Sequence, residues 1–253
     1  MSISLIKPIF VYLKLNLYQS LNMNKFSLKT LYALFAIVIA TLISACGKSD
    51  EVQINVGSFS VYNASPTFST YDIYLNGSKL NTAALPFGGG VKYTQLAQGT
   101  YEAKFTTAGE TAAVYTKTGM SIGNNAFTTL YLTGTTGNFD GLLVPDNFGT
   151  PNTEKAYVRF INLSPDAPAL DLNIKDGAAV TTNKAYKAAS EFIAVDPGAK
   201  IFELKETVSS TVKSTLESTN LVKANFYTVI ARGKLSPSGA LERNFSGQVI
   251  THQ

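Results

Sequence analysis

An internal repeat constrains this chain more than any other feature of its sequence. Beyond residue 51, residues that lie 99 positions apart match from one apolar segment to the next. A single offset that holds over many segments indicates duplicated structural units. The sequence therefore predicts two homologous domains of about 100 residues each, at 52–149 and 150–253. The identical pairs are Asn63 and Asn162, Ser65 and Ser164, Pro66 and Pro165, Asp72 and Asp171, Gly99 and Gly198, Phe127 and Phe226, Thr129 and Thr228, Gly134 and Gly233, and Leu142 and Leu241.

Within each repeat the apolar residues alternate with polar ones. Phe59 and Val61 fall on one face of an extended segment and Ser60 on the other, and residues 155–162 alternate in the same way. This period of two is typical of strands that bury one face. Turn residues such as the Asn76-Gly77 pair separate the segments. The strands predicted in the first repeat are residues 57–63, 71–75, 91–96, 100–106, 113–120, 127–133 and 141–144.

We therefore expect an all-β chain of two tandem, immunoglobulin-like antiparallel β-sandwich domains that follow an N-terminal signal peptide. Residues 142–155 contain prolines and a glycine among polar neighbours and are the predicted join. The most helix-like segment is 207–220, but its density of Ser and Thr favours a strand with a loop.

The N-terminus has the layout of a secretory signal. Lys25 and Lys29 precede an uncharged apolar run at 31–43, and the small residues Ser44 and Ala45 follow it. This order predicts a signal peptide over residues 1–45, with Met23 as a possible true start. A retained membrane helix is the alternative, because the uncharged window is almost long enough to cross a bilayer.

Cys46, the only cysteine, follows that signal directly. The tetrad Ile43-Ser44-Ala45-Cys46 resembles a bacterial lipobox, and this resemblance implies cleavage before Cys46, a thioether lipid on its sulfur, and an acyl chain such as palmitate on the new amino terminus. An ordinary free thiol is the alternative. The next residues, GKSDE, resemble surface-export signals of Bacteroidota lipoproteins. We therefore expect a lipidated tether at 46–56 that holds the protein on the outer membrane, facing outward.

Charge and residue counts exclude several classes of function. The formal charge of +4 comes from four lysines in residues 1–45, so the rest of the chain carries equal numbers of basic and acidic residues. Such a body has no electrostatic reason to bind nucleic acid. One cysteine cannot form an intramolecular disulfide or a zinc site of several cysteines. His252, the only histidine, lies beside the C-terminus, where we expect a solvated tail residue.

Two segments of the second repeat carry a family resemblance. Residues 157–177, YVRFINLSPDAPALDLNIKDG, and residues 197–206, PGAKIFELKE, resemble the domain of unknown function 4397 family. Looser copies occur in the first repeat at 61–77 and 98–105, without the D-A-P segment. The resemblance implies a β-sandwich in a secreted or surface location, and it implies no chemistry.

Four kinds of motif have both a structural and a functional interpretation. The Asn-x-Ser-Pro segments predict turns; ligand contact is the alternative. Asp171 and Asn173 have the spacing of calcium ligands, but Lys175 interrupts the pattern, so a hairpin is favoured. The glycine-rich segment 86–92 lacks the G-K-[ST] signature of a phosphate loop and predicts a loop between strands. Acids that could serve a hydrolase are Asp140, Asp166 and Asp196, and aromatic residues that could stack on sugars or cover a junction are Phe68, Phe148 and Tyr186.

The sequence as a whole favours a non-enzymatic, lipid-anchored protein of the bacterial envelope with a role in recognition, adhesion or structure. It assigns no catalytic, cofactor-binding or metal-binding residues, and its one site residue is the lipid attachment at Cys46. The membrane is the expected partner through that lipid, with a glycan or an envelope protein as the ligand. A glycan-binding accessory of polysaccharide uptake and a carboxylate-dependent hydrolase are the alternatives.

Overall fold

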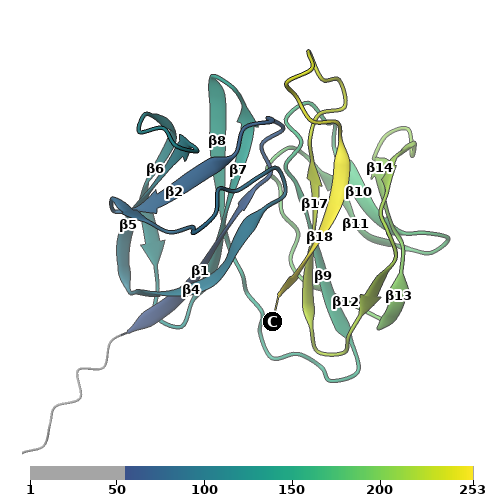
Figure 1. The fold of residues 1–253 in the computed structure, drawn as a ribbon. Coiled ribbons are helices and arrows are strands. Elements are labelled where there is room, and N and C mark those ends of the chain that lie inside the picture. Colours follow the sequence, from purple (N-terminus) through teal and green to yellow (C-terminus); the bar gives the residue numbers. More distant parts are fainter. Residues whose placement is uncertain (1–54, 253) are drawn as a thin grey trace, which may run out of the picture. The chain divides into compact units, whose positions relative to one another are not determined.

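The structure is a computed structural model that describes residues 55–252 (Figure 1). The described residues fold into strands, turns and loops, and the predicted all-β, antiparallel sandwich class is confirmed. Since this part of the chain has no helix, it has none that could cross a bilayer. The predicted signal peptide at 1–45, Cys46 and nearly all of the 46–56 tether lie outside the described residues. Within the described range the chain forms one compact unit.

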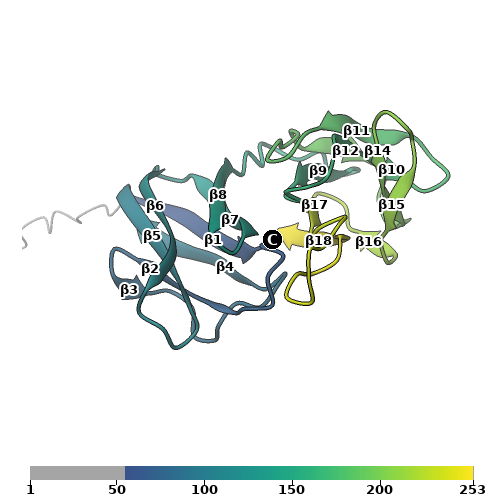
Figure 2. The same cartoon turned by 90° about the horizontal axis from the view of Figure 1, so that it is seen from above.

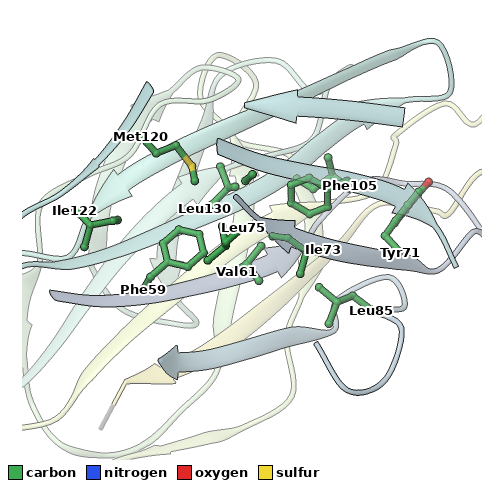
Figure 3. Close-up of a cluster of buried hydrophobic side chains, with 12 residues drawn as sticks. Phe59, Val61, Tyr71, Ile73, Leu75, Leu85, Phe105, Met120, Ile122 and Leu130 are labelled. Carbon is green, nitrogen blue, oxygen red and sulfur yellow. The ribbon is translucent and has the colours of Figure 1, made fainter. Parts of the chain in front are cut away.

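The N-terminal sandwich consists of two four-stranded sheets. Their orders are β4-β1-β7-β8 and β3-β2-β5-β6, and all neighbours are antiparallel except β1 and β7, which are parallel. The strands are β1 (Val56–Asn63), β2 (Tyr71–Leu75), β3 (Ser78–Lys79), β4 (Gly90–Ala97), β5 (Gly99–Thr107), β6 (Ala113–Ile122), β7 (Phe127–Thr135) and β8 (Asn138–Pro145). The apolar faces of the two sheets pack against each other and form a core that contains Phe59, Val61, Ile73, Phe105 and Leu130 (Figure 3).

The C-terminal sandwich uses the same scheme. Its sheets are β12-β9-β17-β18 and β11-β10-β14-β15, with a separate pair β13-β16, and β9 and β17 are again parallel. Its core contains Val158, Phe160, Leu172, Leu204 and Val229. The strands are β9 (Ala156–Asn162), β10 (Leu170–Ile174), β11 (Ala179–Lys184), β12 (Ile193–Val195), β13 (Gly198–Lys200), β14 (Phe202–Glu206), β15 (Val212–Thr215), β16 (Thr219–Leu221), β17 (Phe226–Arg232) and β18 (Ser246–His252).

The 99-residue offset holds for most strands and fails at the last one. β2 and β10 occupy 71–75 and 170–174, but a longer loop after Gly233 delays β18. In β7, Tyr131 pairs with Leu142, whereas the residue equivalent to Tyr131, Ile230, pairs with Gln248. The predicted match of Leu142 with Leu241 is therefore wrong. Leu241 lies in the longer loop and is 78% exposed.

The Asn-x-Ser-Pro segments form the predicted turns. The Oδ1 atom of Asn63 accepts a hydrogen bond from the backbone amide of Ser65 at 3.1 Å. Asn162 accepts the equivalent bond from Ser164 at the same distance. The Ser65 hydroxyl then donates to the carbonyl of Gly134 at 2.8 Å, while Ser164 makes the equivalent bond to Gly233. All of these groups are buried. Each turn therefore fastens the end of the first strand of its sandwich to the end of a central strand.

The other loop motifs also have structural roles. The Oδ1 atom of Asp171 accepts hydrogen bonds from the Asn183 amide and the Thr207 hydroxyl, and Asp176 lies in the β10–β11 turn with φ 55°. Among residues 55–252 no group of three or more acidic, histidine or cysteine side chains is arranged to hold a metal ion. Residues 86–89 form a loop before β4, as the glycines predict.

Candidate functional site: the junction of the two sandwiches

The polar faces of two sheets, β4-β1-β7-β8 and β12-β9-β17-β18, are not solvated, because they cover each other. Ser60 in β1 and Arg159 in β9 face away from their own cores, yet they are only 1% and 2% exposed. An apolar cluster joins the two outer faces, with Tyr131 and Val144 from one sheet and Ile161, Ile230 and Ile250 from the other. The prediction of half-buried strands is therefore incomplete: β1, β7, β9 and β17 are buried on both faces. We call this contact the junction.

A buried ion pair crosses the junction. The guanidinium of Arg159 bonds Asp146, which follows β8, and the two side chains are 2% and 0% exposed. Arg159 also donates from Nε to the Thr228 hydroxyl at 2.8 Å and lies over the ring of Phe192 at 4.7 Å. A buried charge is tolerated only where its partner and its remaining hydrogen-bonding sites are supplied in this way.

The second carboxylate oxygen of Asp146 also has hydrogen-bond donors. Its Oδ2 atom accepts hydrogen bonds from the Thr129 hydroxyl at 2.6 Å and from the Tyr93 hydroxyl at 2.7 Å. Burial, and secondarily the charge of Asp146, raise the pKa of Tyr93, so this phenol stays protonated. The network thus contains one negative charge and one positive charge, and hydroxyl donors satisfy the oxygens that the arginine does not reach.

His252 is part of this network and not the solvated tail residue that its position suggested. It is 5% exposed, and the C-terminal end of the chain lies between the two sandwiches in both views (Figure 1, Figure 2). Its Nε2 atom lies 2.7 Å from the Thr228 hydroxyl, and its Nδ1 atom lies 3.2 Å from the Tyr93 hydroxyl. Since Tyr93 donates to Asp146, Nδ1 must carry the proton and Nε2 must accept from Thr228.

The same contacts keep the imidazole neutral. The pKa of His252 is lowered to about 4, chiefly by burial; the charge of Asp146 opposes this shift, and the charge of Arg159 adds to it. The ring therefore has both nitrogens engaged and carries no charge at neutral pH.

Phe148 closes the other side of the network. It lies in the link between β8 and β9, and its ring centre is 4.9 Å from that of Phe226, 5.6 Å from Phe192 and 5.3 Å from His252. These are the separations of packed aromatic pairs. The link is therefore part of the junction, and its aromatic side chain shields the polar centre from water.

A groove opens along one edge of the junction, between the edge strands β4 and β18. It has a volume of about 500 Å³ and is lined by Tyr62, Lys92, Tyr93 and residues 248–252. Lys92 and Thr251 are exposed on its rim. The volume falls within the usual range for small-ligand sites, roughly 300–1,000 Å³. We call it the junction groove.

The three acids that the sequence suggested for a hydrolase, Asp140, Asp166 and Asp196, have different partners in the structure. Asp140 pairs with Lys187 across the junction, and Asp196 pairs with Lys155. The carboxylate of Asp166 accepts hydrogen bonds from the backbone amides of residues 235 and 236. Each carboxylate has its own structural partner, and these three do not form a catalytic pair.

The three aromatic residues singled out in the sequence all cover the junction. Phe148 packs within it, the Tyr186 hydroxyl lies 3.4 Å from that of Thr133, and Phe68 stacks under Arg243. Sequence reasoning missed the members of the polar network, Asp146, Arg159 and His252. The available signal was in β7 and β17, where apolar residues occupy both faces of the strand.

A family model matches part of the chain. The family described as Domain of unknown function (DUF4397) is found at residues 57–173. The match runs from β1 into β10, so it covers the N-terminal sandwich and the opening strands of the C-terminal one. A second copy of that domain stays a prediction. No curated protein matches the chain.

Solved structures resemble the chain only distantly. The Bacillus anthracis TIE protein is 12% identical with a TM-score of 0.24, and the similarity covers 71% of this chain and 34% of that one, so this chain spans about a third of its length. CBMbc (family CBM26) from Eubacterium rectale Amy13K, solved in complex with maltoheptaose, is 10% identical with a TM-score of 0.22, covering 78% of this chain and 96% of that one. Superpositions this loose establish neither a ligand nor an activity here.

Proposed function

We propose that this chain is a non-enzymatic recognition protein, anchored to the bacterial outer membrane through a lipid on Cys46, which binds its ligand in the junction groove. The signal-like leader and the lipobox-like tetrad support the location. Multiple buried acyl chains make detachment slow, since each CH₂ group contributes about 0.8 kcal/mol. The tether would then present the two sandwiches as one body close to the membrane.

The junction groove carries the recognition part of the proposal. Its two walls come from different sandwiches, and the ion pair and aromatic packing beneath them hold those walls together. A site preformed in this way binds without the cost of ordering its walls.

The polar groups at the junction support a structural role over a catalytic one. His252 is neutral with both ring nitrogens engaged, and Asp146 is shielded and ion-paired. A general base must be free to take a proton from a substrate. The network here is occupied in joining the sandwiches, which favours binding over hydrolysis.

A glycan is the ligand class that the groove favours. Tyr62 and Tyr93 place aromatic rings in its wall, while Lys92, Gln248 and Thr251 add polar groups. The C–H face of a sugar packs against an aromatic ring, and its hydroxyls need such hydrogen-bonding partners. This combination supports the glycan-binding accessory over an adhesin that docks on a flat protein surface.

A glycan array tests the proposal with the full-length protein in detergent. We expect binding to at least one polysaccharide, and we expect Thr251→Trp, which fills the groove, to lower that affinity about tenfold or more, since one lost buried contact of about 1.4 kcal/mol has this effect. Thr118→Trp, on the exposed edge strand β6, is the matched control and should bind normally. Binding that survives Thr251→Trp, or no glycan binding, would overturn the assignment of the groove.

A further inference from the structure

The chain contains three arginines, and all three lie at the junction. Arg159 forms the buried ion pair, but Arg232 and Arg243 form no ion pair with any residue in the described range 55–252. The Nε and Nη1 atoms of Arg232 and the Nε atom of Arg243 are buried without a hydrogen-bond partner. Buried polar atoms are normally paired, so these donors point to a missing acceptor.

Both guanidinium groups are held in place by aromatic rings of the other sandwich. Arg232 lies 4.2 Å over the ring of Phe87, and Arg243 lies 3.6 Å over the ring of Phe68. Stacking of this kind fixes the plane of the guanidinium but gives its N–H groups no acceptor, so they still need one. Gly88 also approaches closely: a Cβ atom there would lie 1.9 Å from Nη1 of Arg232.

The two positive charges also lie close to each other. Burial lowers the pKa of Arg232, and the charge of Arg243 lowers it further. Glu242, the acid beside Arg243 in the sequence, is bound to Lys234 at 2.8 Å and to the Ser238 amide at 2.6 Å. Like charges this close repel unless an anion lies between them.

The arginine pair adjoins the junction groove through Gln248. This residue lines the groove, and its Nε2 atom donates to the Gly88 carbonyl at 3.0 Å, beside the Arg232 side chain. Its Oε1 atom, like the arginine nitrogens, is buried without a partner. Arg232 therefore lies directly behind the end of the groove that Gln248 lines, because both side chains approach Gly88.

We propose that Arg232 and Arg243 bind the acid group, a carboxylate or sulfate, of an acidic glycan that lies in the junction groove. The inference rests on the proposed function and adds the class of sugar to it. Two guanidinium edges present several N–H donors to an oxyanion, which matches the fork geometry that arginine uses for such groups. A neutral glycan would leave both charges uncompensated.

The test compares acidic polysaccharides with their neutral counterparts, using the full-length protein in detergent. The probes are polygalacturonate with its methyl ester and a sulfated polysaccharide with its desulfated form. We expect at least one acidic member to bind about tenfold or more tightly than its neutral partner, since hydrogen bonds to a charged group are stronger than those to a neutral one. Arg232→Gln with Arg243→Gln should abolish that preference and leave the affinity for the neutral partner unchanged.

Three controls make the outcome decisive. Lys104→Gln with Lys117→Gln removes the same charge from β5 and β6, where Lys104 also lies over a tyrosine ring, and should keep the preference. If the double variant does not fold, Arg243→Gln alone, at a partly exposed side chain, should reduce the preference for the acidic member, and an unchanged preference would overturn the inference. Sodium phosphate should compete only weakly, because it cannot fill the groove.

Each contrary result has a distinct meaning. Equal binding of acidic and neutral partners by the unaltered protein overturns this inference and leaves the proposed function standing. Tighter binding to phosphatidylglycerol vesicles than to any acidic glycan, lost in the arginine variants, overturns the glycan in favour of a lipid headgroup. The absence of any glycan binding overturns both proposals.

Discussion

Asp146→Asn is expected to lower the free energy of unfolding by about 3–5 kcal/mol, the cost of leaving a buried charge without its partner. The substitution keeps the shape of the side chain but leaves the Arg159 guanidinium, 2% exposed, without its counter-charge. The other contacts of Arg159, with Thr228 and the Pro145 carbonyl, are neutral and cannot replace it. Urea unfolding of residues 47–253 measures the loss directly.

Asp140→Asn is the matched control for that result. Asp140 also forms an ion pair across the junction, but it and its partner Lys187 are 42% and 35% exposed. An exposed pair contributes about 1 kcal/mol or less. In Asp146→Asn with Arg159→Met, much of the lost stability should return, because no buried charge remains. Equal costs for the two single aspartate variants would contradict the buried ion pair.

Stability is expected to fall by about 3 kcal/mol as the pH is lowered from 6.5 toward 4, because of His252 alone. Burial lowers its folded pKa to about 4, against about 6.5 when unfolded. Between these values the unfolded chain binds the proton and the folded chain does not, so stability is complete above pH 6.5 and is lost below it. Each unit of difference contributes about 1.4 kcal/mol.

His252→Gln isolates this effect, because the chain has no other histidine. The amide can still bond the Thr228 and Tyr93 hydroxyls without titrating. We expect its stability to stay level until about pH 4.5, where the unfolded chain begins to bind protons at carboxylates whose pKa is lowered in the folded protein, such as Asp72. The measurement is urea unfolding at several pH values. A wild-type curve as level as that of the variant would mean that the imidazole is exposed or already charged in the folded protein.

The strands could be predicted from the sequence because local patterns determine them. Alternation of apolar residues around Phe59 and Val61 sets which face meets the core, and the Asn76-Gly77 pair sets the hairpin between β2 and β3. The interpretation of 207–220 as strand and loop is confirmed by β15 and β16. In each case the deciding residues lie within a few positions of the element they control.

The junction could not be predicted in the same way, because it depends on pairs of residues that are distant in the sequence. Ser60 and Arg159 look like solvent-facing positions of alternating strands, and only the second sheet shows why they are buried. His252 looked like a tail residue for the same reason. Because the loop after Gly233 is longer than its counterpart in the first repeat, β18 begins later than the 99-residue offset predicts. The offset therefore paired Leu142 with the exposed Leu241, whereas its structural equivalent is Gln248.

The arginine pair shows a related limit. Arg232 and Arg243 stand at unremarkable positions near the last hairpin of the chain, and their aromatic partners Phe87 and Phe68 precede them by well over a hundred residues. The usable signal was compositional. Lysines occur throughout the chain, whereas each of its three arginines contacts an aromatic ring at the junction.

Intact-mass spectrometry of the protein extracted from its native membrane tests most directly whether these sandwiches are carried on a lipid anchor. We predict a chain that begins at Cys46, with a mass increased by a thioether-linked lipid and an amide-linked acyl chain. Cys46→Ser should lose the added mass and stay with the uncleaved leader. A native chain whose cysteine carries a bare thiol would contradict the proposed lipid anchor and the proposed location at the outer membrane.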